Sequence, residues 1–224
     1  MKSLVLIGIG ETAQLAFEYF THDSDYTVIA FAVDDEYLPV DQPLMHNLPI
    51  IALSKLHQLY EPSEIELFVA VSSGKLNRVR RDLYTRFKQM DYTFATYISS
   101  KCFVWSNVVV GENCFILEHN TLQPFVTIGN NVTLWSGNHI GHRSVIADNC
   151  FISSHCVISG FCTIGKNSFL GVNCTLENNI DIAADSFIGA SALIRKSTTP
   201  TSVFQQDPTS CSKISSHRLF RIKE

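Results

Sequence analysis

The sequence is poor in charge and has no long hydrophobic run. Lys and Arg total 17 and Asp and Glu total 21, which gives a net charge of −4, and neither sign is gathered into a long cluster. Nucleic acids and anionic membranes attract proteins through such clusters, so we expect a small-molecule partner, with no nucleic acid and no membrane insertion. The first apolar run is too short for the core of a signal peptide, and no later stretch reaches membrane-spanning length. These absences predict a soluble, cytoplasmic protein.

The chain also lacks the cysteine pattern of a disulfide or zinc protein. Its 7 cysteines are odd in number and include no C-x-x-C pair. Multiples of six residues separate Cys102, Cys114, Cys150, Cys156, Cys162 and Cys174. This spacing indicates a repeat that accepts a small apolar side chain at one position, so we predict reduced packing residues and no bound metal.

Apolar runs and amphipathic stretches alternate in the first 98 residues. The predicted strands are residues 3–9, 27–33 and 65–71, and the predicted helices are 11–20 and 76–90. Because alternating strands and helices form parallel α/β sheets, we predict a Rossmann-like domain over residues 1–98.

A glycine motif, Gly8-Ile-Gly10-Glu-Thr-Ala13, joins the first predicted strand to the first predicted helix. Glycines let the backbone approach a phosphate, and a helix N-terminus offers unpaired amides and a positive dipole. A tight turn that binds nothing is the alternative. Because the domain ends before the second half of a dinucleotide fold, we predict a mononucleotide, that of a sugar nucleotide.

Further candidates for nucleotide binding follow the predicted strands at the same edge of the sheet. The full candidate set is Gly8, Gly10, Glu11, Asp34, Asp35, Ser72 and Ser73. Acidic residues in a solvated loop are an equally good interpretation of Asp34 and Asp35.

From residue 104 an aliphatic residue occupies every sixth position without a miss. These residues are Val104, Val110, Ile116, Leu122, Ile128, Leu134, Ile140, Ile146, Ile152, Ile158, Ile164, Leu170, Leu176, Ile182, Ile188 and Ile194. No helical period matches this pattern. We expect each hexapeptide to form one side of a triangular coil, with about five coils stacked at roughly 4.8 Å and the aliphatic column inside. Gly or Ala often follows the aliphatic residue, where we expect the chain to turn.

With these motifs the sequence resembles the bacterial hexapeptide-repeat sugar acyltransferases, which include sialic acid O-acetyltransferase-like proteins and N-acetyltransferases of nucleotide-linked 4-amino sugars. The resemblance rests on the glycine motif with Asp34-Asp35 and on residues 138–146, 152–160 and 164–173. It implies a left-handed β-helix over residues 99–196, followed by a C-terminal tail, 197–224. It also implies a homotrimer that uses acetyl-CoA to N-acetylate a nucleotide-linked amino sugar for surface glycans such as lipopolysaccharide, with active sites between neighbouring β-helices.

His142 matches the catalytic base of that family, and imidazole accepts a proton near neutral pH. Gly160, one coil further on, matches a glycine whose amide faces the acetyl oxygen. Many relatives follow the base with Glu or Asp, but this chain has Arg143, which cannot accept a hydrogen bond from the ring. The residue that orients the ring is therefore open: a backbone carbonyl, Asn138 or a group of the adjacent subunit.

The resemblance also suggests an acetyl-CoA site on the later coils. Its candidate residues are His155, Gly160, Lys166, Gly171, Asn173 and Gly189. The segment 206–210 replaces a loop with which relatives contact CoA, so no contact is predicted there.

Other functions stay open at this stage. The first alternative is O-acetylation of a sugar hydroxyl, as in sialic acid or a polysaccharide. The second is a metal-dependent enzyme of the carbonic anhydrase kind, using His139, His142 and His155. The third is a non-catalytic trimeric scaffold. Within the transferase hypothesis, His119 beside Glu118 is a less favoured base.

Overall fold

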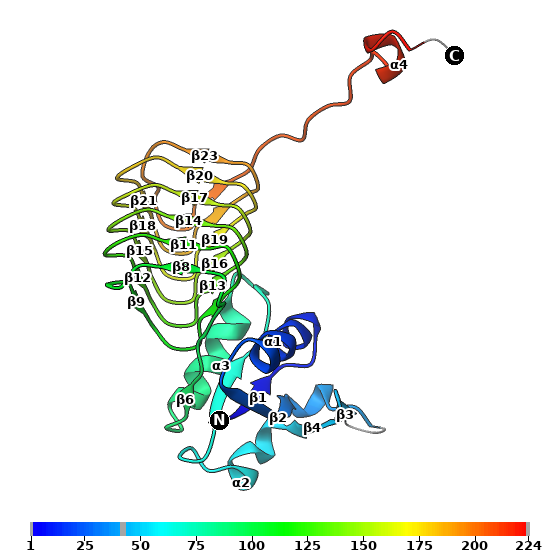
Figure 1. The fold of residues 1–224 in the computed structure, drawn as a ribbon, viewed down its shortest axis with the longest axis vertical. Coiled ribbons are helices and arrows are strands. Elements are labelled where there is room, and N and C mark those ends of the chain that lie inside the picture. The colour runs from blue at the N-terminus through cyan, green and yellow to red at the C-terminus, as the bar shows by residue number, and fades with distance from the viewer. Residues whose placement is uncertain (1, 41–43, 223–224) are drawn as a thin grey trace.

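The computed structural model describes residues 2–40 and 44–222, and it begins with a six-stranded sheet (Figure 1). The strand order is β3-β4-β2-β1-β5-β6. All neighbours are parallel except β3 and β4, which form an antiparallel hairpin. The strands are β1 (Lys2–Ile7), β2 (Tyr26–Val33), β3 (Leu44–Met45), β4 (Leu48–Ala52), β5 (Glu66–Val69) and β6 (Thr93–Phe94).

The helices of this part are α1 (Glu11–His22), α2 (Leu56–Leu59) and α3 (Arg78–Lys88), with short 3-10 turns at Asp35–Tyr37 and Leu53–Lys55. The predicted helix 76–90 begins two residues late. Lys75, Leu76 and Asn77 all have positive φ, between 51° and 64°, which a right-handed helix excludes. Sequence analysis assigned no elements to residues 34–64, where β3, β4 and α2 lie.

From residue 97 the chain winds into a coil of two-residue strands, drawn as stacked rungs in Figure 1. Each strand up to residue 176 pairs in parallel with the strand eighteen residues further along, as in Phe115 with Thr133 and His139 with Val157, and Phe187 pairs with Val203, sixteen residues further along. Parallel strands stacked in this way agree with the hexapeptide repeat and are consistent with the left-handed β-helix that it predicts.

The strands make the three faces of a prism. Face 1 contains β7 (Tyr97–Ile98), β10 (Phe115–Ile116), β13 (Thr133–Leu134), β16 (Phe151–Ile152), β19 (Phe169–Leu170), β22 (Phe187–Ile188) and β24 (Val203–Phe204). Face 2 contains β8 (Phe103–Val104), β11 (Thr121–Leu122), β14 (His139–Ile140), β17 (Val157–Ile158), β20 (Thr175–Leu176) and β23 (Leu193–Ile194). Face 3 contains β9 (Val109–Val110), β12 (Thr127–Ile128), β15 (Val145–Ile146), β18 (Thr163–Ile164) and β21 (Asp181–Ile182). We call the edge between faces 1 and 2 the first edge, that between faces 2 and 3 the second, and that between faces 3 and 1 the third.

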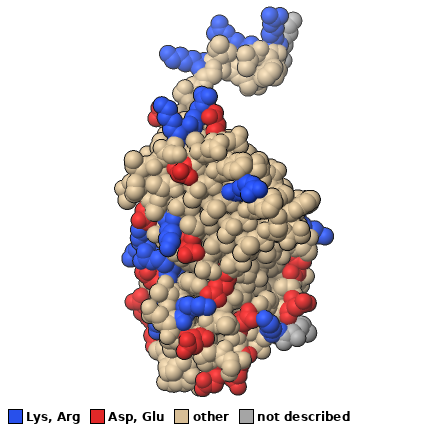
Figure 2. Space-filling model, turned by 90° about the vertical axis from the view of Figure 1, so that its left-hand side faces the viewer, with Lys and Arg blue, Asp and Glu red and all other residues tan. Residues whose placement is uncertain are grey.

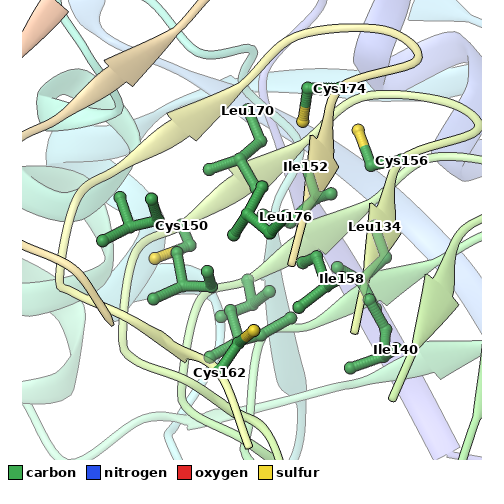
Figure 3. Packing of buried hydrophobic residues seen from close by; sticks show 14 of the residues in the cluster. Leu134, Ile140, Cys150, Ile152, Cys156, Ile158, Cys162, Leu170, Cys174 and Leu176 are labelled. Carbon is green, nitrogen blue, oxygen red and sulfur yellow. The ribbon is translucent and has the colours of Figure 1, made fainter. Parts of the chain in front are cut away.

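The predicted aliphatic column fills the interior of this prism, together with cysteines (Figure 3). The column is buried from Ile116 to Ile194, but Val104 is 37% exposed because the first coil has no coil beneath it. All seven cysteines are free, as predicted, and only Cys211 is exposed. Burial raises the pKa of the Cys114 and Cys150 thiols to about 12, so both stay protonated.

The chain turns after the aliphatic residues, as predicted, with the turn at the two residues that follow the glycine or alanine. From Val110 to Ile188 the residue with positive φ is the third after the aliphatic residue, as in Asn131, Arg143 and Asn149, and the glycines that directly follow the aliphatic residues lie outside the left-handed region. Those glycines serve close stacking instead. A Cβ on Gly141 would lie 2.5 Å from the backbone of the next coil.

The sheet domain packs on face 1 and along the third edge. Arg80 of α3 is 2% exposed and donates to Thr133 Oγ1 and to the carbonyls of Asn131 and Cys150, at 3.1 and 3.0 Å. Arg78 pairs with Asp185 at 2.7 Å. On the other side of the domain, α1 packs on Phe115 within a shared apolar cluster. The last residues leave the prism as an extended tail that ends in α4 (Ser216–Leu219; Figure 1).

Candidate functional site

His142 lies at the second edge with its side chain exposed, on the far side of the prism from face 1. Its backbone N–H donates to Gln123 Oε1 at 2.9 Å, and its ring atom Nδ1 lies 3.3 Å from the same oxygen. The edge of the Phe161 ring packs against the imidazole, with the centroids 5.0 Å apart. The imidazole is therefore held on two sides and open on others.

Gly160 lies one coil above His142, directly against the imidazole. A Cβ at this position would come within 2.6 Å of ring atom Cε1 and 2.9 Å of Nε2, so only glycine leaves room for the ring. The amide predicted to face the acetyl oxygen donates instead to Asn178 Oδ1, at 3.0 Å, in this structure.

The second edge differs from the third in the residues that adopt positive φ. The third edge uses Asn113, Asn131, Asn149, Asn167 and Asp185, residue types that adopt this conformation readily. The second edge uses Phe125, Arg143 and Phe161, with φ of 65°, 59° and 60°, and reaches an asparagine only at Asn179. Such bulky residues cost about 1–2 kcal/mol each in this conformation, a cost typical of functional sites. The guanidinium of Arg143 lies over the Phe125 ring, 4.3 Å from its centroid.

A second candidate site is a cavity of about 570 Å³ at the carboxyl ends of the sheet strands. Five of the predicted nucleotide-binding residues line it: Gly8, Gly10, Glu11, Asp34 and Ser72. Asp35 and Ser73 do not. Ser54 donates to the Asp35 carboxylate from its hydroxyl at 2.6 Å and from its amide, which holds the pKa of that carboxyl below its usual range.

The two motif glycines have different roles. Gly8 has a φ of 127°, and a Cβ there would lie 2.6 Å from the carbonyl oxygen of Ala70, so the fold itself requires this glycine. Gly10 has no heavy atom within 4 Å of the position that a Cβ would take. It precedes α1 directly, so the space beside it is open toward the unpaired amides of a helix N-terminus.

The predicted acetyl-CoA residues are spread over all three edges of the prism. Gly160 is at the second edge, and His155, Gly171, Asn173 and Gly189 are at the first. Lys166 is at the third edge, where its Nζ lies 4.0 Å from Asp148 Oδ2. A single chain therefore does not bring these residues together on one surface.

The other histidines do not join His142. His139 is on face 2, and His119 and His155 are at the first edge. Glu118, the proposed partner of His119, is engaged by Tyr19 and by Ser136, at 2.8 and 2.6 Å. Over residues 2–40 and 44–222, no group of three or more His, Cys, Asp or Glu side chains is arranged to hold a metal ion.

Two polar residues of this site were not predicted: Gln123, which contacts His142, and Asn178, which contacts Gly160. The eighteen-residue period contains the signal for both, because residues that differ by about eighteen meet on adjacent coils. Asn178 follows Gly160 by eighteen residues, and Gln123 precedes His142 by nineteen. Tyr37 and Leu53 of the cavity were also missed, because the loops that place them have no regular pattern.

Comparison with known proteins supports the repeat and the fold. A family model described as the bacterial transferase hexapeptide (six repeats) matches residues 125–160. No curated protein sequence matches the chain. In the described part of the chain, no helix is both long enough and apolar enough to cross a membrane.

Several solved structures share the fold along most of the chain. One is a histidine-to-asparagine mutant of perosamine N-acetyltransferase from Caulobacter crescentus with CoA and GDP-perosamine (20% identity, TM-score 0.78, 91% of this chain and 93% of that one). Another is PerB of the same organism with the same two ligands (21%, 0.77, 91% and 93%). A third is the acetyltransferase domain of PglB from Neisseria gonorrhoeae (18%, 0.79, 91% and 96%).

Proposed function

We propose that this chain is an enzyme that transfers the acetyl group of acetyl-CoA to the amino group of a nucleotide-linked sugar, in the synthesis of surface glycans. The observation that carries the proposal is the exposed imidazole of His142, held at a prism edge between Gln123 and Gly160. The structures similar to this chain include complexes with both CoA and GDP-perosamine, and one of these proteins has a histidine replaced by asparagine.

In this proposal His142 is the general base. The sugar amine attacks the thioester carbonyl carbon, so that a C–N bond forms and the C–S bond breaks. Nε2 of His142 takes the proton that the nitrogen loses, and the departing thiolate of CoA then receives it. No covalent enzyme intermediate is needed. Arg143 takes no part, because its guanidinium is directed to Phe125.

Gly160 has two proposed roles. Its missing side chain makes room for the imidazole, and its amide stabilises the negative charge that develops on the acetyl oxygen. Since Asn178 accepts a hydrogen bond from this amide at 3.0 Å, the acetyl oxygen would have to replace the Asn178 oxygen as acceptor.

The proposed site needs two copies of the chain. The cavity belongs to the domain that packs on face 1, whereas His142 lies at the opposite edge, so a sugar nucleotide in the cavity cannot reach the histidine of its own chain. Exposed apolar residues at and beside the second edge, Phe125, Val145 and Phe161, suit burial against another copy. The face turned to the viewer in Figure 2 carries charges of both signs and a broad uncharged area. We therefore propose a homotrimer with shared sites.

The proposed division of labour follows the three segments of the chain. Residues 1–98 form a Rossmann-like domain that binds the nucleotide through Gly8, Gly10, Glu11, Asp34 and Ser72. Residues 99–196 form the left-handed β-helix that carries the chemistry, and residues 197–224 are a tail.

Acetyl-CoA is proposed to lie in the groove between two copies. Such a groove would combine Gly160 at the second edge of one chain with His155, Gly171, Asn173 and Gly189 at the first edge of another. Lys166 lies at the third edge. It can contact this acetyl-CoA only if the third edge of one of the copies also lies at the groove.

Gly10→Ala is expected to weaken nucleotide binding about tenfold, roughly 1.4 kcal/mol, without lowering stability. Free space surrounds the new methyl group in the protein itself, yet the methyl group occupies the space where a phosphate would approach the start of α1. Titration calorimetry with GDP and UDP measures the affinity, and thermal unfolding measures stability.

Gly74→Ala is the matched control for this variant. Gly74 does not itself line the cavity, and its Cβ would make only an ordinary contact, 3.8 Å from Cγ2 of the lining residue Val79. Nucleotide affinity should then stay at the wild-type value. A stable Gly10→Ala protein that binds nucleotide as tightly as wild type would show that no phosphate binds beside Gly10.

The proposed function is tested by thiol release from acetyl-CoA against a panel of UDP-, GDP- and dTDP-linked amino sugars, each paired with the corresponding hydroxyl sugar. Turnover with one amino sugar supports N-acetylation and identifies the nucleotide. Turnover with hydroxyl sugars alone would replace the proposal by O-acetylation, and no turnover with any acceptor, including free sialic acid, would refute a sugar acetyltransferase.

A further inference from the structure

Gln123 is the polar side chain that contacts the His142 ring, from the coil below. The single oxygen Oε1 faces two groups of His142: the backbone N–H at 2.9 Å and ring atom Nδ1 at 3.3 Å. The Asn138 side chain, an earlier candidate for orienting the ring, is engaged elsewhere and accepts from the Cys156 amide at 2.7 Å.

The backbone contact determines which end of the Gln123 amide faces the ring. A backbone N–H can only donate, so the group opposite it must be the oxygen and not the NH₂. An amide oxygen can only accept, and it meets Nδ1 favourably only if that nitrogen carries hydrogen. The Nδ1–H tautomer is thus favoured, and the lone pair of Nε2 is free.

Within one chain, over the residues that the structure describes, no other hydrogen bond or ion pair reaches the His142 ring. The adjoining segments on the coils below and above, 123–126 and 159–161, contain no titratable side chain. On the same turn of the coil Arg143 is the charged residue, and its guanidinium lies over Phe125. Glu177, in the column of Gln123 three coils higher, is paired with Arg195 at 2.8 Å. A neutral amide therefore acts alone on the ring.

We propose that Gln123 is a positioning residue, which orients His142 and selects its Nδ1–H tautomer without a negative charge. The inference rests on the proposed role of His142 as the base. A carboxylate at this place would also favour the protonated imidazolium, and the proton would then have to leave before the ring could act as a base. Beside a neutral orienting group, the imidazole stays unprotonated, and so able to act as a base, at lower pH than it would beside a carboxylate.

The test uses the full-length protein and three substitutions. Gln123→Ala removes the orienting group, Gln123→Glu makes it charged, and Gln58→Glu adds the same charge on an exposed helix of the sheet domain. Nitrogen NMR of the His142 ring, identified by its loss in His142→Asn, reads the tautomer without any substrate. The pH profile of kcat/KM reports the pKa of the catalytic base in the free enzyme.

In wild type and Gln58→Glu the ring is expected to carry its hydrogen on Nδ1, and in Gln123→Ala a large share should move to Nε2. Gln123→Ala should lose about tenfold in kcat with unchanged CoA affinity. Gln123→Glu should keep the tautomer and restore most of kcat at high pH. The acid limb of its profile should shift upward by about one pH unit, the low end of the effect of a neighbouring opposite charge.

The NMR results would overturn the inference if they showed an Nε2–H ring in wild type, or a tautomer that Gln123→Ala leaves unchanged. An unmoved acid limb in Gln123→Glu would also overturn it, because a merely structural glutamine gives that result. The NMR arm needs no turnover, so the inference can fail while acetyl transfer is observed, and it can hold where no acceptor is found.

Discussion

Replacing His142 with asparagine is expected to lower kcat by roughly 10²–10⁴, the usual contribution of a general base, while CoA affinity stays unchanged. Asparagine is smaller than histidine and retains a polar side chain, so the exposed edge should tolerate it. The backbone bond from residue 142 to Gln123 is also retained, since it uses the main-chain N–H. The loss should therefore appear in the chemical step, measured by thiol release at saturating substrate.

His119→Asn is the matched control, because His119 is the alternative base and also lies at an exposed edge. It has a φ of 60°, a conformation that asparagine adopts readily. Near-normal turnover is expected. The reverse pattern, with an active His142→Asn and an inactive His119→Asn, would move the base to the first edge.

Replacing Arg80 with methionine is expected to lower the free energy of unfolding by about 2–4 kcal/mol. The side chain is buried, and burial lowers its pKa to about 10, so the guanidinium is still charged at neutral pH. No carboxylate pairs with it in the described structure; its partners are the Thr133 hydroxyl and the carbonyls of Asn131 and Cys150. Methionine fills similar volume but donates to none of them.

A substitution of Arg80 does not remove the backbone carbonyls that it binds. In the variant these carbonyls stay buried without the hydrogen bonds that Arg80 donates. Cys150 still accepts from the Thr133 amide at 3.0 Å, whereas no second donor to the Asn131 carbonyl occurs among residues 2–40 and 44–222. This asymmetry is why an apolar replacement is expected to destabilise here, although apolar replacement of a buried ion pair is often neutral.

Urea unfolding at matched protein concentration measures this effect, since stability of an oligomer depends on concentration. Arg81→Met is the control, because the Arg81 guanidinium forms its ion pair with the neighbouring Asp82, at 2.7 Å. Its unfolding midpoint should stay near that of wild type. Equal midpoints for Arg80→Met and wild type would show that the other contacts, among them the ion pair of Arg78 with Asp185 and the apolar cluster around α1, are sufficient to hold the domain on face 1.

The coil could be predicted from sequence because its contacts recur at one fixed separation. A period of six residues places each aliphatic side chain inside, and a period of eighteen sets which residues stack, as in the pairing of His139 with Val157. The same regularity predicted that Gly160 lies above His142. It failed at Val104, where the column ends, and it did not show that the glycines serve close stacking, because that role depends on the distance between coils.

The sheet domain was predictable only where strands and helices are regular. The motif glycines and Asp34 were placed at one cavity because parallel strands end at a common edge. Asp35 is the next residue, yet its carboxylate accepts from Ser54 and does not line the cavity. A one-residue difference in a loop reverses the direction of a side chain, and no periodic pattern records it.

By itself the sequence determined the repeat, the neighbours of each rung and the histidine at the second edge, since all three follow from local spacing. Only the tertiary structure decided which face the sheet domain covers. That choice depends on contacts between distant parts of the chain, above all those of Arg80 and Asn77 of the sheet domain with coil carbonyls. The position of the sheet domain separates the cavity from His142 by the width of the prism, because a domain packed on face 1 cannot also reach the opposite edge.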